Sequence, residues 1–371
     1  MKIDISKIDT EQFAVDEHII NGELCYLVQP KALSCNWNQS NKIFRSSLWN
    51  SEGELISASF PKFVNWSENP ENFPVPTSLN KAVVMEKLDG STLIISKYKG
   101  QFIIRTRGTI DATNLEKNGF EISYLLEKYP VITKGGTTFY NSYSEDWEFS
   151  LIFEWTSPFN QIVLNYGDEA DIKLIGIIEH RDYSLWNQVA LNDVAKQLGV
   201  GRPATYQFDS IEDLISDVQL WDGKEGVCVY SKGGQEIHKV KSFQYLKLHY
   251  FKSNATYENT VELFFEFGMP DYKTFEAKLI EKFDYECYQM VRNFVSVICE
   301  GYKDVLKIVA GMQNFVDTKL KPLSTRRQQA EVVFSSYGKE SNRSAFVFTL
   351  LDGHQLDKEK LKKLLYQVTK K

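Results

Sequence analysis

A lysine stands two residues before an Asp-Gly pair in the segment Lys87-Leu88-Asp89-Gly90, directly after the apolar run Ala82-Val83-Val84. The apolar run predicts a strand, so Lys87 is expected at a strand end. A lysine amine can serve as a covalent nucleophile through nitrogen, and glycine lets the backbone approach a nucleotide closely. Taken alone, the motif also fits an exposed lysine before a turn, because short motifs often match by accident.

Further polar clusters surround Lys87 in a fixed order along the chain. Most of them begin or end a segment that reads as a strand, which is where functional side chains gather at the edge of a sheet. The clusters are Arg45 and Lys62-Phe63-Val64-Asn65 upstream, then Arg105-Thr106-Arg107-Gly108, Phe153-Glu154-Trp155, Lys224-Glu225-Gly226 and Lys239-Val240-Lys241 downstream.

These residue types suit nucleotidyl transfer by a lysine. The amine must lose its proton before it attacks an α-phosphate, so we expect nearby positive charge to lower its pKa. Lysines, arginines and Mg²⁺ can stabilise the negative charge that gathers on the phosphate oxygens. Glu154 and Glu225 offer the hard oxygen ligands that such a metal needs, directly or through water.

Lys239 and Lys241 are expected on one face of a strand, because side chains alternate with a period of two. They can line one wall of a phosphate pocket, although two lysines in this pattern also fit a solvated face. Trp155 or Phe153 can stack on a purine, or either can belong to the core. His238 is expected to be a packing or surface residue rather than a general base.

The composition bounds the class of protein. The chain has 371 residues, 43% of them hydrophobic and 25% charged, which fits two globular domains with sizeable cores. No apolar run approaches the length of a membrane span, and five scattered cysteines indicate neither a zinc site nor a disulfide framework. A cytosolic, reduced location is expected. The net charge of −6 excludes a uniformly basic nucleic-acid binder, but a local basic groove remains compatible with it.

The elements that must position these residues are mostly strands from 81 to 250, after a stretch of short mixed segments over 1–80. Residues 67–76 are rich in Asn and Pro and predict a loop. Two hairpins are expected, one over 92–104 with its turn at Lys99-Gly100 and one over 226–241, and residues 173–178 read as a buried strand.

Beyond 254 the pattern becomes helical. Apolar residues recur at three- and four-residue spacing and predict one face of a long helix: Phe275, Leu279, Phe283, Cys287, Met290, Phe294 and Ile298. A second helix is expected from about Asp357 to Val368. We therefore expect domains at 1–254 and 255–371, the second all-helical.

This order of motifs resembles the covalent nucleotidyltransferase superfamily of RNA ligases, DNA ligases and capping enzymes, and within it the phage RNA ligase 1 family. The resemblance rests on Lys87-Leu88-Asp89-Gly90-Ser91, on Phe153-Glu154-Trp155 with its tail at Pro158, Asn160 and 162–164, on Glu225-Gly226, on Lys239-Val240-Lys241, and on Arg45 and Lys62-Phe63-Val64-Asn65 upstream. It covers residues 40–250. The sequence departs from the family at Ser46, where glycine is usual, at Arg107, where lysine is common, and at Trp155, which replaces a smaller aromatic.

The resemblance implies an α+β fold: an antiparallel-rich, ATP-grasp-like nucleotidyltransferase domain followed by a helical domain that selects RNA. It implies an ATP-dependent RNA ligase that joins 5′-phosphate and 3′-hydroxyl ends through a lysyl-AMP and an RNA-adenylate. The implied catalytic residues are Lys87, Asp89, Glu154, Glu225, Lys239 and Lys241. The implied nucleotide contacts are Arg45, Lys62, Glu86, Lys87, Arg107, Glu154, Lys239 and Lys241, with Glu225 at the metal, Mg²⁺ or Mn²⁺.

Single-stranded or stem-loop RNA, with tRNA as one candidate, is the implied partner, in the cytoplasm or in the host cytoplasm for a viral protein. One alternative is a DNA ligase or a GTP-dependent capping enzyme of the same superfamily. Both usually continue into a small β-barrel after the Lys-x-Lys motif, whereas this chain turns helical. A second alternative is a non-catalytic RNA-binding module, which has no need of the nucleophile Lys87.

Overall fold

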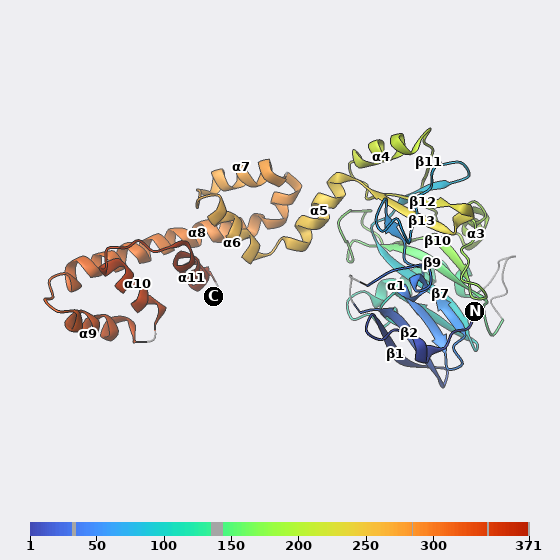
Figure 1. Cartoon of the computed structure of the whole chain (residues 1–371), viewed down its shortest axis with the longest axis horizontal. Helices are drawn as coiled ribbons and strands as arrows, with labels where there is room; N and C mark the ends of the chain where they lie inside the picture. The colour runs from blue at the N-terminus through green and yellow to red at the C-terminus, as the bar shows by residue number, and fades with distance from the viewer. Residues whose placement is uncertain (32–34, 135–143, 284, 340, 370–371) are drawn as a thin grey trace. The chain divides into compact units, whose positions relative to one another are not determined.

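The computed structural model describes residues 1–31, 35–134, 144–283, 285–339 and 341–369. The chain divides into two compact units, Met1–Leu246 and Lys247–Lys371. The first unit is dominated by antiparallel strands and the second is helical, which confirms the expected α+β class (Figure 1). The division falls inside helix α5 (Phe243–Asn254), and the expected boundary at 254 lies at the end of that helix.

The strands of the first unit form three sheets. One sheet has the order β1-β2-β3-β4 (Phe13–Ile20, Glu23–Pro30, Ser47–Asn50, Leu55–Ala58). A second has the order β10-β9-β7-β8 (Asp171–Glu179, Phe149–Thr156, Ser91–Tyr98, Gln101–Arg105). The third has the order β11-β6-β12-β13-β5 (Thr205–Tyr206, Val83–Lys87, Gly226–Ser231, Glu236–Lys241, Val64–Asn65). Of these described pairings, only that between β13 and β5 is parallel.

Both predicted hairpins are present. Strands β7 and β8 meet at Lys99 and Gly100, whose φ angles of 48° and 77° match the mirror-image turn that suits twisted antiparallel strands. Strands β12 and β13 form the other hairpin, with Gly226 paired to Lys241 at its open end. The predicted strand at 173–178 lies within β10, and residues 67–76 form no strand or helix.

The sheets share a hydrophobic core. One buried cluster takes side chains from all three sheets, including Trp49 from β3, Ile94 from β7, Ile152 from β9, and Met85 and Cys228 from β6 and β12. Helix α3 (Leu191–Leu198) packs on β10, and α4 (Ile211–Gln219) packs on β12 and β13. Helices α1 (Gly119–Lys128) and α2 (Val131–Lys134) complete the described α-helices of this unit before α5.

In the second unit, α8 (Tyr285–Phe315) is the central element, and α6, α7, α10 and α11 all contact it. The bounds of the other helices are Tyr257–Glu266 for α6, Tyr272–Phe283 for α7, Arg326–Tyr337 for α9, Asn342–Leu351 for α10 and Lys358–Thr369 for α11. A π-helical turn, Val316–Leu320, follows α8. Helix α11 confirms the predicted C-terminal helix.

The prediction of one long helix across 275–298 is wrong. Its residues belong to two helices, α7 and α8, which pack against each other. The buried track of α8 runs through Val291, Val295 and Ile298, while Met290 is 36% exposed. Apolar residues recur at three- and four-residue spacing on both helices, because each helix buries one apolar face. The spacing alone therefore did not show that α7 ends and a second helix, α8, begins.

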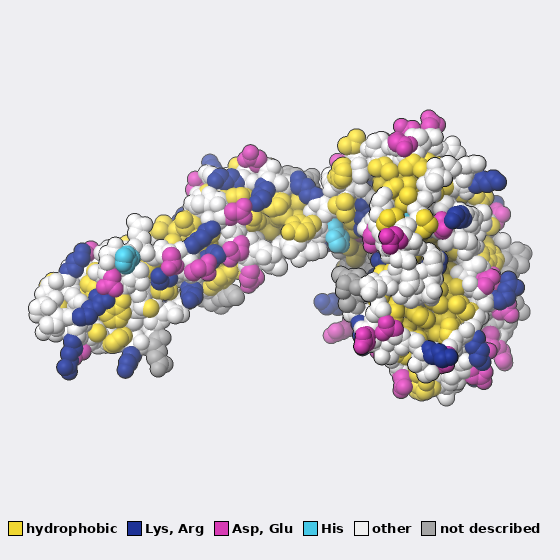
Figure 2. All heavy atoms as spheres, in the orientation of Figure 1, with side chains coloured by type: hydrophobic (Ala, Val, Ile, Leu, Met, Phe, Trp, Pro, Cys, Tyr) yellow, Lys and Arg dark blue, Asp and Glu magenta, His cyan; other side chains and the backbone are white. Residues whose placement is uncertain are grey.

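Charges of both signs are interspersed over the visible face of each unit in Figure 2. None of the helices in the described ranges combines the length and the apolar character needed to cross a bilayer.

Candidate active site

A cavity of about 590 Å³ opens in the first unit, a volume that suits a nucleotide-sized ligand. Its walls come from the ends of β6, β9, β12 and β13 and from the segments around Arg45 and Arg107. The structure brings the following predicted residues together on its lining: Arg45, Glu86, Lys87, Asp89, Arg107, Glu154, Glu225, Lys239 and Lys241.

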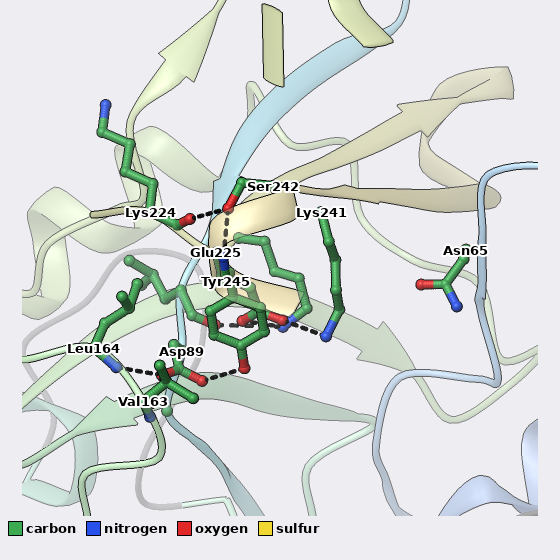
Figure 3. Close-up of polar contacts among 12 residues, drawn as sticks. Asn65, Asp89, Val163, Leu164, Lys224, Glu225, Lys241, Ser242 and Tyr245 are labelled. Atoms are coloured by element: carbon green, nitrogen blue, oxygen red, sulfur yellow. Dashed lines mark hydrogen bonds and ion pairs between the residues drawn. The ribbon is translucent and has the colours of Figure 1, made fainter. Parts of the chain in front are cut away.

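Lys62 lines a second pocket with Trp37 and Asn69 instead. Its ammonium lies 5.6 Å from the centroid of the Trp37 ring. Asn65, from the same motif, donates a hydrogen bond to Glu68, and Figure 3 shows it apart from the lysine cluster.

The strand register explains how Glu225 comes to lie between two lysines. Gly226 at the start of β12 is paired with Lys87 of β6 on one side and with Lys241 of β13 on the other. Glu225 precedes it, and its two carboxylate oxygens each lie 2.8 Å from a lysine, Oε2 from Lys87 Nζ and Oε1 from Lys241 Nζ (Figure 3). Glu225 is 1% exposed, so its single negative charge is balanced by these two lysine contacts rather than by solvent.

Gly226 is required where it stands. Its φ of 144° lies where side chains are rarely tolerated, and a Cβ there would meet the Val240 carbonyl oxygen at 2.0 Å. The glycine therefore lets β12 and β13 approach closely, next to the carboxylate they position.

The expectation that positive neighbours lower the pKa of Lys87 is wrong for this arrangement. Burial acts to lower the pKa, but the carboxylates of Glu225 and Glu154 outweigh it and raise the pKa above its usual value. Lys87 is thus a protonated partner of Glu225, and its amine becomes nucleophilic only when that proton leaves.

Asp89 acts as an anchor for the nucleophile segment. Its Oδ2 accepts hydrogen bonds from the backbone N–H groups of Val163 and Leu164, both at 2.7 Å, and its Oδ1 accepts from the Tyr245 hydroxyl at 2.7 Å. Tyr166 accepts a hydrogen bond from the Asp89 backbone N–H. The geometry therefore favours a positioning role for Asp89, whereas the family resemblance implied a catalytic one (Figure 3).

Gly90 approaches another strand of the same chain. A Cβ at this position would lie 2.3 Å from the Trp155 carbonyl oxygen on β9, and the Gly90 N–H donates to Glu154 Oε1 at 3.1 Å. The glycine thus allows a close approach to β9 that fixes Glu154 beside Lys87, and Gly90 also lines the cavity, so its expected approach to a nucleotide stays a prediction.

Burial raises the pKa of Glu154 to about 7, against the opposing pull of Lys87 and with a further contribution from Glu225. Glu154 therefore exchanges a proton near neutral pH.

Glu154→Gln is expected to flatten the dependence of stability on pH between 4.5 and 7. The folded chain holds this proton more tightly than the unfolded chain, so the free energy of unfolding falls as the pH rises through this window. The amide keeps an acceptor for Gly90 and carries no charge, so the variant should be the more stable protein at pH 8, by at most about 3 kcal/mol. Urea unfolding at pH 5 and pH 8 measures this, with the exposed Glu212→Gln of α4 as control. Equal pH slopes for the wild type and Glu154→Gln would contradict it.

Several cations face the cavity. Burial lowers the pKa of Lys239 to about 8, helped by the charges of Lys241 and Arg45. The Arg45 guanidinium stacks over the Phe63 ring at 4.7 Å, and Arg107 is exposed at the rim. Together they form a cationic wall suited to phosphate oxygens.

A buried network behind that wall was not predicted. The Arg105 guanidinium is fully buried and donates hydrogen bonds to the hydroxyls of Ser57 and Ser46, at 2.8 and 2.7 Å. The Ser46 hydroxyl in turn donates to the Arg107 carbonyl oxygen at 2.8 Å. Ser46 thus ties the segments of Arg45 and Arg107 together, and only its departure from the family glycine marked it in the sequence.

Of the two alternatives for Phe153 and Trp155, the structure favours the core, because both are buried in the core of the second sheet, although Trp155 also lines the cavity. The other rings among the residues lining the cavity include Phe63, Tyr230 and Tyr245, and the Tyr245 ring lies 4.8 Å from Lys241 Nζ. Nothing in the local sequence distinguished Tyr245, which follows the Lys-x-Lys strand at the start of α5. His238 is buried, as expected for a packing residue.

The described residues contain no group of three or more His, Cys, Asp or Glu side chains placed to hold a metal ion. Glu225 and Glu154 are two carboxylates on one cavity. Mg²⁺ in phosphate chemistry is commonly held by one or two carboxylates together with substrate phosphates, so this donor set fits a metal that arrives with a nucleotide.

The antiparallel sheets hold a cavity whose lining, with Lys87, Glu154, Glu225 and the two β13 lysines, has the residue types that nucleotidyl transfer needs. A family model described as RNA ligase matches residues 43–267, which is more than half of the chain. The chain belongs to this RNA ligase family.

A protein of Autographa californica nuclear polyhedrosis virus, described as a bifunctional polynucleotide kinase/RNA ligase, is 27% identical over 221 residues. The match covers 56% of this chain and 30% of that protein, so the chain spans about a third of the length of this relative.

Two solved structures illustrate the structural similarity. An archaeal ATP-dependent RNA ligase gives a TM-score of 0.47 at 15% identity, covering 80% of this chain and 76% of that one. A mutant RNA ligase of Naegleria gruberi with ATP and Mn gives a TM-score of 0.41 at 14% identity, covering 67% of this chain and 84% of that one.

Proposed function

We propose that this chain is an ATP-dependent RNA ligase that joins 5′-phosphate and 3′-hydroxyl RNA ends. The observation that carries the proposal is the placement of the Lys87 amine in a nucleotide-sized cavity, 2.8 Å from Glu225 and beside the cationic wall of Arg45, Arg107 and Lys239. Membership of the RNA ligase family supports RNA as the substrate class.

In the proposed reaction, the deprotonated amine of Lys87 attacks the α-phosphorus of ATP. A nitrogen–phosphorus bond forms, the bond to the leaving oxygen breaks, and diphosphate departs with the electron pair. An oxygen of the RNA 5′-phosphate then displaces Lys87 to give an RNA-adenylate. Attack by a 3′-hydroxyl on that activated 5′-phosphate seals the strand and releases AMP.

Each cavity residue has a proposed role in these steps. Lys239, Lys241, Arg45 and Arg107 contact phosphate oxygens, and Glu154 contacts the ribose. Glu225 Oε2 accepts a hydrogen bond from the Lys87 ammonium in the free protein. Glu225, with Glu154 nearby, would hold Mg²⁺ or Mn²⁺, which supplies neutralising charge at the phosphate oxygens when bound. Lys62 lines the second pocket and not the nucleotide cavity, so we assign it no contact with ATP.

The division of labour between the two units is also part of the proposal. The cavity residues lie between Arg45 and Tyr245, within the first unit, which we assign to adenylation. We assign RNA selection to the helical unit. Stem-loop RNA such as tRNA, and a cytoplasmic location, remain predictions.

Covalent labelling tests the function. The full chain is incubated with Mg²⁺ and ATP or GTP labelled at the α-phosphate. Transfer of label from ATP alone, followed by joining of RNA but not DNA strands, is the expected result. Label from GTP would favour a capping enzyme, preferential joining of DNA a DNA ligase, and no label with tight RNA binding a non-catalytic module.

A further inference from the structure

Two phenylalanines are exposed beside the cavity. Phe120 of α1 is 60% exposed and Phe159, just after β9, is 71% exposed, and their ring centroids lie 5.8 Å apart in an edge-to-face arrangement. Tyr124, one helical turn after Phe120, is also exposed and lies on the same face of α1. We call Phe120, Tyr124 and Phe159 the aromatic patch. Apolar side chains gathered at the surface in this way mark a site of interaction.

A buried polar frame holds the patch in place. The Ser157 hydroxyl lies 2.6 and 2.7 Å from the two carboxylate oxygens of Glu121, which is buried. The same hydroxyl accepts hydrogen bonds from the backbone N–H groups of Phe159 and Asn160, at 2.9 and 3.1 Å. The frame joins the start of α1 to the segment after β9, so the two exposed phenylalanines stand on segments that are tied together by buried hydrogen bonds.

The patch adjoins the rim of the nucleotide cavity. Asn118, next but one to Phe120, and Asn160, next to Phe159, both line the cavity, as does the exposed Arg107. Asn118 donates a hydrogen bond to Glu121 and Asn160 donates one to Ser91, just after the nucleophile segment. The aromatic patch and the cavity are therefore continuous through these residues.

We propose that the aromatic patch is the stacking platform for an unpaired base of the RNA strands being joined, within the first nucleotides of the joint. The inference rests on the proposed ligase function and adds the part of the substrate that the surface beside the nucleotide cavity recognises. Arg107 at the rim contacts the strand's phosphate, and the rings of Phe120 and Phe159 receive a base.

The chemistry favours a base over other occupants. Every nucleobase has a π face, so an aromatic pair binds single strands with little regard for sequence, and a charged rim beside it tracks the backbone. The patch consists of three rings, far less than the area of a stable protein–protein interface, and it adjoins a cavity whose cationic wall suits phosphates.

The test is a coupling experiment on the full chain. Single-turnover sealing of 5′-adenylated RNA is measured for the wild type and for the double variant Phe120→Ala, Phe159→Ala. Each protein is given normal strands, strands abasic near the 5′ end, and strands abasic near the 3′-hydroxyl end. Leu220→Ala, which removes an exposed apolar side chain at the end of α4, is the matched control.

We expect the double variant to seal normal RNA roughly tenfold or more slowly, in line with the loss of one stacked base. We expect the wild type to slow by a similar factor on one of the abasic strands, and that strand identifies the side of the joint. On that strand the double variant should slow no further, because the interaction is already gone. Phe159→Tyr should seal like the wild type, and Leu220→Ala should show no change.

The stacking proposal is overturned if the slowing caused by the double variant and the slowing caused by the abasic strand multiply when they are combined. It is also overturned if the double variant seals normal RNA at the wild-type rate. A difference in sedimentation mass between the wild type and the double variant overturns it as well, because it would assign the patch to a second copy of the chain. Covalent labelling by ATP separates this failure from a failure of the proposed function. A wild-type protein that is not labelled and seals no adenylated RNA disproves the ligase function, and the stacking proposal with it.

Discussion

Lys87→Ala is expected to abolish covalent AMP labelling by ATP, with a loss on the order of a thousandfold or more. Among the described lysines that line the cavity, neither of the other two is placed to replace it: Lys239 and Lys241 both stand on β13, which β12 separates from β6, and Lys241 is paired to the other oxygen of Glu225. The measurement is gel-resolved transfer of label from ATP to protein in the presence of Mg²⁺.

The fold should survive this change. Glu225 keeps the Lys241 partner at 2.8 Å, so the buried carboxylate is not left without a counter-charge. Thermal unfolding of the variant checks this. Lys196→Ala, which removes an exposed lysine from α3 outside the cavity, serves as control and should be labelled like the wild type.

A second readout separates loss of the nucleophile from general damage. Sealing of RNA that already carries a 5′-adenylate needs no lysyl-AMP, so Lys87→Ala should retain some of that activity. A folded Lys87→Ala protein that still acquires label from ATP would place the nucleophile elsewhere and remove the basis of the proposed function.

The sequence predicted the strands that carry the site because their signals are local. The hairpin around Lys99-Gly100 needs only two residues that tolerate positive φ between apolar runs. The placement of Lys239 and Lys241 on one face of a strand needs only the strand's period of two. Motif order then placed Lys87, Glu225 and the β13 lysines on one cavity.

The features that the sequence did not predict depend on contacts between distant segments. Asp89 is an anchor because backbone N–H groups 74 and 75 residues away donate to it, and no local pattern encodes that. The raised pKa of Lys87 depends on the register that brings Gly226 opposite it. Trp155 could not be assigned from its motif, because the face of β9 that is buried is decided by the other strands of the sheet.

Capture of ATP is expected to fall as the pH rises through about 8, because Lys239 loses its proton there. Burial and the neighbouring cations Lys241 and Arg45 lower the pKa of Lys239 to about 8 from 10.5, and the charged form is the one that binds phosphate. At pH 9 its charged fraction drops by about tenfold. Lys239→Arg keeps the charge at this pH, and Lys239→Ala lacks it throughout and should be adenylated poorly at every pH.

The measurement is the ratio of kcat/KM for adenylation between the wild type and Lys239→Arg from pH 7 to pH 9.5. Deprotonation of Lys87 affects both proteins and cancels in the ratio, so the ratio should fall by about tenfold from pH 7 to pH 9, and about fivefold of that fall comes between pH 8 and 9. The ratio of kcat values between the wild type and Lys239→Arg should fall only at higher pH, because bound phosphate favours the charged ammonium of Lys239. A flat kcat/KM ratio would contradict the assignment of Lys239 to phosphate binding.

Stability should show the opposite trend to ATP capture, which distinguishes the titration of Lys239 from alkaline unfolding. Between pH 8 and 10.5 the unfolded chain binds this proton more tightly than the folded chain, so the Lys239 contribution to the free energy of unfolding rises with pH. Urea unfolding of the wild type and of Lys239→Met isolates that contribution, because the methionine side chain carries no proton. A wild-type protein that loses ATP capture above pH 8 while its stability relative to Lys239→Met increases has lost a phosphate contact, and one that loses both together has begun to unfold.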